Sequence, residues 1–159
     1  MGLNLAEAAM REGKIVTYLP AYGLEVRGGT AHCTIAISDE EIASPVASSP
    51  DFMVVMNQPS LDQFQNRVHS GGVLFINSST TQNTVTRGDI DIVEVPASGI
   101  AEEMKSPKSA NMVMLGAFNK KTNLVSISSM IEVLEETLKG KKALIGINKR
   151  ALMAGYDLL

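Results

Sequence analysis

Two short runs of apolar residues constrain the fold of this chain most. Phe52–Met56 is apolar at every position, and Val73–Asn77 is apolar up to its final asparagine. Strands of this kind are covered on both faces, which is typical of a parallel sheet with helices packed against it. The two runs therefore predict buried strands inside a layered structure.

The segments around these runs alternate between strand and helix patterns. Further strands are expected at residues 14–19, 31–38 and 91–96. Helices are expected at residues 3–13, 97–104, 110–117, 128–138 and 142–158, with Ser128 or Ser129 capping the helix at 128–138. A further helix, with Pro59 near its start, is expected to contain Leu61, Phe64 and Val68. This order predicts an α/β fold with a Rossmann-like, open, mostly parallel sheet and flanking helices. The chain has no evident linker, so we expect one domain over residues 1–159.

Charge and hydropathy exclude several classes of function. The formal net charge is −3 and aromatic residues make up 4% of the chain, which argues against a general nucleic-acid binder. No apolar run approaches the roughly 20 residues that a membrane span needs, and no signal segment opens the sequence. We therefore expect a cytoplasmic protein that does not enter a membrane.

The inventory of reactive residues is small. Cys33 is the only cysteine, so the chain forms no internal disulfide and holds no Cys-ligated iron–sulfur cluster of its own. His32 is its neighbour, but adjacent side chains on a strand point to opposite faces, so we expect no metal site. The chain also lacks a Gly-x-Ser-x-Gly elbow, a phosphate-binding P-loop and paired carboxylates near a histidine. We expect no catalytic residue in this chain alone. The methionine-rich run Ala110–Ala117 is more typical of core packing than of a subunit interface.

A glycine-rich segment at residues 18–30 is expected to form a loop between two strands. It holds a carboxylate and a guanidinium two residues apart, at Glu25 and Arg27. Glycine permits positive φ and close backbone approach, so this loop can fit tightly against a ligand or partner. The alternative is a surface turn closed by a local ion pair. The candidate contact residues of the loop are Tyr22, Gly23, Glu25, Arg27, Gly28 and Gly29.

Two further polar clusters follow the apolar runs. Asn57, Gln58, Pro59 and Ser60 come after the first run, and Asn77 and Ser78, with Ser79 and Thr80, end the second. Ligands of open α/β sheets bind at the carboxyl ends of the strands, so we expect all three clusters at one edge of the sheet. The helix start after Gln58 would favour an anionic group. The alternative is that these residues only cap the helices that follow.

Several of these segments together carry a family resemblance. They are Leu5-Ala-Glu-Ala-Ala9, Tyr22-Gly-x-Glu-x-Arg-Gly-Gly-Thr-Ala31, Met56-Asn-Gln-Pro-Ser-Leu61, Gly71-Gly-Val-Leu-Phe-Ile-Asn-Ser78 and Ala110-Asn-Met-Val-Met-Leu-Gly116. In this order and spacing, the chain resembles the gamma subunit of 2-oxoacid:ferredoxin oxidoreductases over essentially its full length. The segment that begins at Tyr22 is the most specific of the five.

The resemblance implies a subunit of a complex that decarboxylates a 2-oxoacid, captures the acyl unit on coenzyme A and passes two electrons to ferredoxin. It implies that thiamine diphosphate and the iron–sulfur clusters belong to alpha, beta and ferredoxin-like delta subunits, and that this chain binds no cofactor alone. The implied role is assembly and placement of coenzyme A, and the isolated chain is expected either to self-associate or to expose an apolar patch where its partners dock. Glu25 and Arg27 would shape the loop or pair with a partner, and Tyr22 would pack against that partner. Asn57, Gln58 and Ser60 would line the crevice.

The resemblance leaves the substrate and one structural question open. The short, separate chain looks most like those of 2-oxoglutarate enzymes, with pyruvate and branched-chain 2-oxoacids as alternatives. The family's first strand and its Gly-x-Gly-Gly-Gln-Gly loop are not in this sequence. Either the segment that carries them is absent from it, or this homologue has lost its first strand. We expect a missing segment, because loss of a central strand would leave a sheet edge unpaired. Two other functions remain: a free-standing α/β domain that binds a nucleotide-like ligand, and an independent enzyme on a Rossmann-like scaffold.

Overall fold

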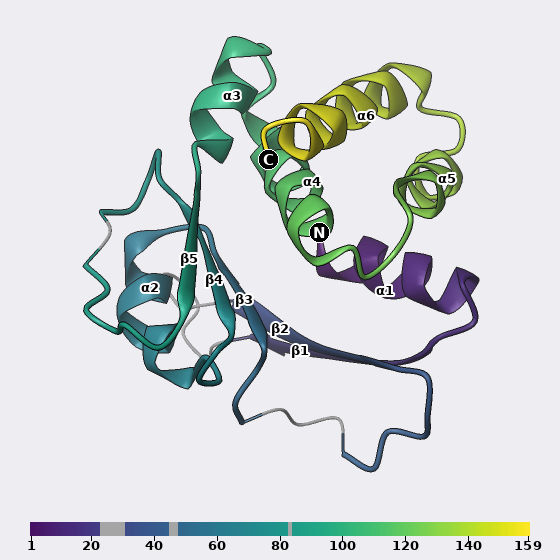
Figure 1. The fold of residues 1–159 in the computed structure, drawn as a ribbon. Coiled ribbons are helices and arrows are strands. Elements are labelled where there is room, and N and C mark those ends of the chain that lie inside the picture. Colours follow the sequence, from purple (N-terminus) through teal and green to yellow (C-terminus); the bar gives the residue numbers. More distant parts are fainter. Residues whose placement is uncertain (23–30, 45–47, 83) are drawn as a thin grey trace. The chain divides into compact units, whose positions relative to one another are not determined.

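The computed structural model describes residues 1–22, 31–44, 48–82 and 84–159, and Figure 1 traces the chain. These residues form two compact units. The ribbon unit joins Met1–Ala47 to Asn123–Ile145, and the sheet unit joins Ser48–Thr122 to Gly146–Leu159. The single domain expected over the full chain stays a prediction.

An antiparallel two-stranded ribbon is the centre of the ribbon unit. β1 (Ile15–Tyr22) pairs with β2 (Ala31–Ser38) along the whole length of both strands. The prediction that the loop begins at residue 18 was wrong, because pairing with β2 extends β1 to Tyr22. This pairing depends on the register with β2, and the glycine-rich composition does not reveal that register.

The helix α1 (Gly2–Arg11) packs on this ribbon. It ends as predicted just before Gly13, whose φ of +82° is a conformation that suits glycine. At its other end the contact is close, because a Cβ on Gly2 would lie 2.6 Å from Sγ of Cys33. α1 thus covers one face of the ribbon from the first residues of β1 to about its middle.

Polar contacts tie α1 to α5 (Ile127–Thr137) in the same unit. Arg11 forms ion pairs with Glu132 and Glu136 of α5. These side chains are exposed, so each pair contributes at most a modest stabilisation.

The N-terminus of α5 is capped differently from the prediction. Oγ of Ser126 accepts a hydrogen bond from the backbone N–H of Ser129 at 3.1 Å, which makes Ser126 the cap instead of Ser128 or Ser129. Oε1 of Glu12 accepts from the N–H of Ser126 at 2.7 Å and fixes this turn from outside the helix. Three of the four residues from 126 to 129 are serines, so the sequence alone allows more than one cap. The hydrogen bond from Ser126 to the distant Glu12 favours Ser126.

The sheet unit contains a parallel sheet in the order β3–β4–β5. Its strands are β3 (Phe52–Val55), β4 (Val73–Asn77) and β5 (Asp91–Val95). β4 is buried at every residue, as predicted. β3 was predicted to be covered on both faces, and this was wrong at its start: Phe52 is 37% exposed, since β3 lies at the end of this strand order.

Helices cover both faces of this sheet. The helical elements of the sheet unit are α2 (Gln58–Phe64), η1 (Gln65–Arg67), α3 (Ala97–Glu103), η2 (Pro107–Ser109), α4 (Ala110–Thr122) and α6 (Lys142–Tyr156). The first residues of α6 belong to the ribbon unit. On one face Leu74 and Ile76 pack with Leu61 of α2. On the other, the rings of Phe75 and Phe118 of α4 lie 5.2 Å apart. The predicted α/β class, with a parallel sheet and flanking helices, is confirmed.

Within the sheet unit α4 and α6 touch backbone to backbone. A Cβ on Gly116 would lie 1.9 Å from the carbonyl oxygen of Leu152, and one on Gly155 would lie 1.8 Å from that of Val113. The methionine-rich run lies in α4, where Met114 is fully buried, so its core-packing interpretation is confirmed.

Candidate functional site

The polar clusters after β3 and β4 come together at the carboxyl end of the parallel sheet. Oγ1 of Thr80 donates to the carbonyl oxygen of Met56 at 2.8 Å, which joins the end of β4 to the end of β3. The N–H of Gln82 donates to Oε1 of Gln58 at 2.8 Å and holds the following loop against α2. Two of the three predicted clusters are therefore neighbours.

Asn57 acts as the cap of α2. Its Oδ1 accepts from the N–H of Ser60 at 3.0 Å, and Pro59 occupies the first turn, where the absence of an N–H is harmless. The capping alternative thus holds for Asn57, whereas binding by Gln58, Pro59 and Ser60 stays a prediction. The carboxamide uses an N–H that an anion at this helix start would otherwise contact, so the cap weakens the expectation of an anionic ligand here.

Asn77 is the most connected residue of the site and is 1% exposed. Its Nδ2 donates to Oγ of Ser98 at 2.9 Å, and its Oδ1 accepts from the N–H of Ser98 at 3.2 Å. Its carbonyl oxygen accepts from Oγ1 of Thr81 at 2.7 Å. One side chain and its own backbone therefore hold the end of β4, the start of α3 and the loop between them in place.

These residues surround a hollow of about 530 Å³ at the surface. It is lined by Gln58, Ser78, Ser79, Thr80, Thr81 and Gln82. The six lining residues offer hydroxyl and carboxamide groups, which donate and accept hydrogen bonds, and none of them titrates near neutral pH. The hollow is open to solvent and offers hydrogen bonds, but its lining cannot transfer a proton as a general acid or base.

The glycine-rich cluster that begins at Tyr22 does not follow a strand of the parallel sheet. β1 belongs to the antiparallel ribbon, so the rule that carboxyl ends of parallel strands share one edge does not apply to the loop after it. Tyr22 is the last residue of β1, whereas Gly23, Glu25, Arg27, Gly28 and Gly29 lie outside the described residues. The premise that placed all three clusters at one edge was therefore wrong for this cluster.

The sequence reasoning missed Thr81, Gln82 and Ser98. Ser98 lies in the first turn of α3, directly after β5, so the same search for polar residues after parallel strands would have found it. Thr81 and Gln82 stand in a polar stretch that gives no signal of a site, and only the fold brings them against Gln58.

Reactive chemistry is sparse in the described part of the chain. Partial burial raises the pKa of the Cys33 thiol, which disfavours the thiolate that a nucleophile needs. Among the described residues no three His, Cys, Asp or Glu side chains gather where they could hold a metal ion. None of the described helices is both long and apolar enough to cross a membrane.

Comparison with known proteins finds relatives along almost the entire chain. The family model for pyruvate ferredoxin/flavodoxin oxidoreductase matches residues 1–158. Ketoisovalerate oxidoreductase subunit VorA of Methanothermobacter thermautotrophicus is 40% identical over 99% of this chain, which spans only 33% of that relative's length. 2-oxoglutarate synthase subunit KorC of Methanocaldococcus jannaschii is 34% identical over 95% of this chain and 81% of its own. Pyruvate synthase subunit PorC of Methanothermobacter marburgensis is 37% identical over 86% of this chain and 77% of its own.

Solved structures share the fold. The gamma subunit of a keto/oxoacid ferredoxin oxidoreductase from Geobacter sulfurreducens PCA matches with a TM-score of 0.82 and 25% identity, over 98% of this chain and 87% of that one. The 2-oxoglutarate:ferredoxin oxidoreductase of Magnetococcus marinus, solved with 2-oxoglutarate, coenzyme A and succinyl-CoA, matches with a TM-score of 0.89 and 25% identity. That match covers 99% of this chain and 28% of the larger one.

Proposed function

This chain belongs to the pyruvate ferredoxin/flavodoxin oxidoreductase family, and on that premise we propose that it is the gamma component of a 2-oxoacid:ferredoxin oxidoreductase. The observation that carries the proposal is the match of the family model to residues 1–158. The reaction is the oxidative decarboxylation of a 2-oxoacid with formation of an acyl-CoA and transfer of two electrons to ferredoxin or another acceptor.

In this complex the chain assembles with the other subunits and positions coenzyme A, and it does not catalyse the reaction by itself. The polar hollow at the carboxyl end of the sheet supports this role, because it offers hydrogen bonds without an acid or a base. The Magnetococcus marinus relative was solved with coenzyme A bound. We infer that the groups around the hollow, from Gln58 to Ser60 and from Asn77 to Gln82, help to place coenzyme A for attack on the acyl unit.

The partners in this proposal are alpha and beta subunits, which bind thiamine diphosphate, and a ferredoxin-like delta subunit with iron–sulfur clusters. The loop with Tyr22, Glu25 and Arg27 would contact one of them. The proposed complex works in the cytoplasm.

The identity of the 2-oxoacid substrate is the most specific part of the proposal. We propose 2-oxoglutarate first. Relatives named for ketoisovalerate, pyruvate and 2-oxoglutarate match at 40%, 37% and 34% identity, so the likeness supports the class of 2-oxoacids more than any one acid. A panel of these three acids therefore belongs in the first assay.

The test is to co-express the tagged chain with the products of the neighbouring genes and purify on the tag. We expect a brown complex that reduces viologen only when a 2-oxoacid, coenzyme A and thiamine diphosphate are all present. A colourless protein that purifies alone and is stabilised by a nucleotide would contradict the proposal and favour the free-standing binding domain.

A matched pair of variants tests the role of the hollow. Gln82→Ala removes a lining carboxamide, and we expect the KM for coenzyme A to rise about threefold to tenfold with little change in kcat. Gln63→Ala removes an exposed glutamine of α2 outside the hollow and should leave both constants unchanged. Equal effects of the two substitutions would contradict placement of coenzyme A by the hollow.

A further inference from the structure

The polar groups of the hollow are only partly available to a ligand. Oε1 of Gln58 accepts from the N–H of Gln82, and Nε2 of Gln58 donates to Oδ1 of Asp62 at 2.8 Å. The hydroxyls of Thr80 and Thr81 donate to main-chain carbonyl oxygens at 2.8 Å and 2.7 Å. A hydroxyl has one hydrogen to donate, so these two threonines have no donor left. Gln58, Thr80 and Thr81 therefore serve mainly to hold the loop in place.

Main-chain N–H groups at the hollow are engaged as well. Phosphate groups are commonly bound by free N–H groups of a loop or of a helix start. The cap at Asn57 uses one N–H at the start of α2. Four lining residues donate their N–H groups to acceptors within the protein at 2.8–3.1 Å, namely Ser78, Thr80, Thr81 and Gln82. These four positions offer no free N–H donor to a phosphate.

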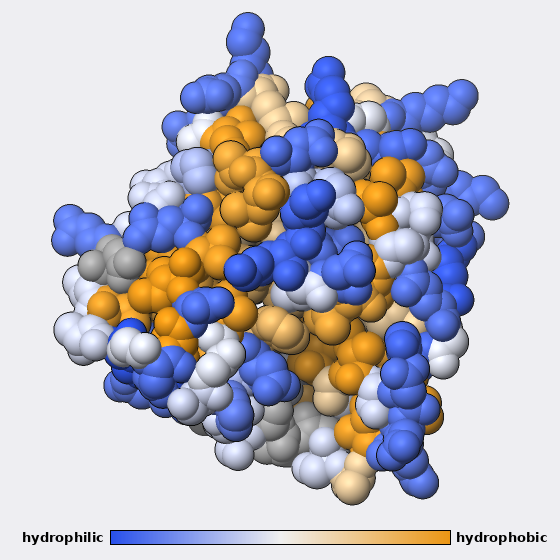
Figure 2. Space-filling model, in the orientation of Figure 1, coloured by the Kyte–Doolittle hydropathy of each residue, from blue (hydrophilic) through white to orange (hydrophobic). Residues whose placement is uncertain are grey.

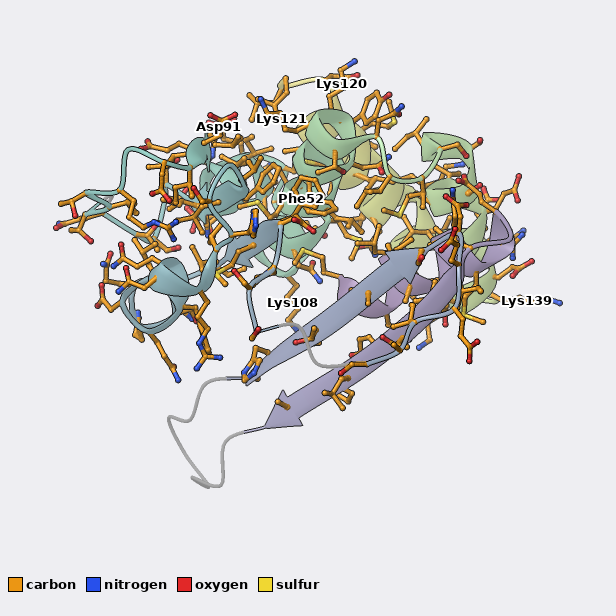
Figure 3. All side chains as sticks on the ribbon, turned by 60° about the horizontal axis from the view of Figure 1, so that its bottom comes forward. Phe52, Asp91, Lys108, Lys120, Lys121 and Lys139 are labelled. Atoms are coloured by element: carbon orange, nitrogen blue, oxygen red, sulfur yellow. The ribbon has the colours of Figure 1, made fainter. Side chains whose placement is uncertain are left out.

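Formal charge at the hollow does not favour an anion. None of its lining residues is a lysine or an arginine. Lys108, Lys120 and Lys121, which Figure 3 labels, belong to η2 and to the last turn of α4 and do not line the hollow. The carboxylate of Asp62, by contrast, is bonded to the lining residue Gln58. A phosphate in the hollow would therefore meet a negative charge without a cation of the lining to balance it.

The groups that remain available are neutral donors. Oγ of Ser79 accepts from the N–H of Gly99 at 3.0 Å, so the hydrogen of this hydroxyl can be donated to a ligand. Within the described residues, the hydroxyl of Ser78 and the carboxamide of Gln82 have no hydrogen-bond partner. These three side chains match an uncharged acceptor, such as the carbonyl oxygen of an amide.

The lining also lacks a surface on which an aromatic base could stack. Hydrophobic residues reach the molecular surface in several places on the face that Figure 2 draws. The hollow, by contrast, is lined by serine, threonine and glutamine. Protein sites for bases usually stack the ring on aromatic or apolar side chains. An adenine ring is therefore a poorer match than a flexible chain with amide groups.

We propose that the hollow binds the uncharged amide arm of coenzyme A through the side chains of Ser78, Ser79 and Gln82, and that the phosphates of coenzyme A lie outside it. This inference rests on the proposed function and deepens it, because it names the part of the substrate that the hollow contacts. The arm carries amide carbonyl oxygens, which accept hydrogen bonds from neutral donors of this kind. It also ends in the thiol that attacks the acyl unit, so binding of the arm directs that thiol.

The first test places charges of opposite sign at one lining position of the co-expressed complex. Gln82→Lys and Gln82→Glu both remove an exposed carboxamide and keep the main-chain bond to Gln58. We expect both to raise the KM for coenzyme A about threefold to tenfold, with a ratio between them that added salt does not change, because the arm is uncharged.

Matched controls correct for the attraction of coenzyme A to distant charges. Gln63→Lys and Gln63→Glu place the same charges at an exposed glutamine of α2 outside the hollow. A corrected ratio that favours Gln82→Lys at low salt and approaches one at high salt would place phosphates in the hollow. That result would overturn the inference.

Fragments of coenzyme A locate the contact without a change of charge. Pantetheine keeps the amide arm and lacks the nucleotide, whereas adenosine 3′,5′-bisphosphate keeps the nucleotide and lacks the arm. With each used as a competitor of coenzyme A, Gln82→Ala should raise the Ki of pantetheine about threefold to tenfold and leave that of the bisphosphate unchanged. A rise for the bisphosphate in place of pantetheine would overturn the inference and keep the placement of coenzyme A by the hollow.

Two other outcomes separate this inference from the proposed function. In an active wild-type complex, Gln82→Ala and Ser78→Ala that change neither the KM for coenzyme A nor either Ki would overturn the inference, while the role of the chain as a gamma component stood. Failure of the wild type to assemble or to use coenzyme A would remove the proposed function and this inference together.

Discussion

Asn77 and Ser98 hydrogen-bond to each other twice, once through Nδ2 and Oγ at 2.9 Å and once through Oδ1 and the backbone N–H at 3.2 Å. One residue ends β4 and the other opens α3, so the pair links two elements that are 21 positions apart. This link sets the geometry of the carboxyl end of the sheet, on which the proposed placement of coenzyme A depends.

Asn77→Ala should therefore destabilise the chain strongly. The substitution leaves the N–H of Ser98 without its acceptor inside the protein, and we expect the free energy of unfolding to fall by about 2 kcal/mol. Urea unfolding followed by circular dichroism measures this change. Asn57→Ala removes a single capping bond and should cost about 1 kcal/mol, so a larger loss for Asn57 than for Asn77 would contradict our interpretation.

The crossing of α4 and α6 should not tolerate a methyl group. In Gly155→Ala the added Cβ would start 1.8 Å from the carbonyl oxygen of Val113, so the helices must separate, at about 3 kcal/mol or more. Gly146→Ala is the control, because its Cβ meets no atom within 4 Å and alanine favours a helix by about 0.5–1 kcal/mol. Thermal unfolding of both variants should show opposite shifts. Shifts in the same direction would disprove the close crossing.

The cap of α5 can be identified by single substitutions. Ser126→Ala should lower the free energy of unfolding by about 1 kcal/mol, because it removes the acceptor for the N–H of Ser129. Ser128→Ala keeps that acceptor and should have little effect. If chemical denaturation finds the larger loss at Ser128, the capping register differs from the one described here.

The pair of Arg87 and Asp89 predicts a dependence on pH. Hydrogen bonds from Arg87 at 2.8 Å and 2.6 Å lower the pKa of Asp89 from 3.8 to about 2. A carboxyl with a lowered pKa adds stability that is present above pH 3.8 and is lost as the pH falls towards 2. In Arg87→Ala we expect the pKa of Asp89 to return towards its ordinary value, which NMR titration of the carboxyl carbon measures. Arg67→Ala should leave that pKa as it is.

The sequence predicted local features well and long-range pairing less well. The buried run of β4, the glycine after α1 and the place of Pro59 in the first turn of α2 all depend on residues close to one another in the chain. Each follows from hydrophobic pattern or turn chemistry within a few positions.

The errors share a different physical origin. The extension of β1 to Tyr22 depends on the register with β2, and the exposure of Phe52 depends on the place of β3 in the sheet. The choice of Ser126 as a cap depends on Glu12, which is 114 positions away. In each case a partner in another element decides between local alternatives that have similar energies.

The full burial of β4 predicts slow hydrogen exchange of its backbone amides. β4 is paired on both sides, by β3 and β5, and its alternate side chains lie in separate layers with Leu61 and Phe118. Its amide protons can therefore reach deuterium only when the sheet unit opens as a whole, whereas amides of exposed segments exchange through small local openings. The exchange rate of the amides from Val73 to Asn77 thus reports how often this unit unfolds in the native protein.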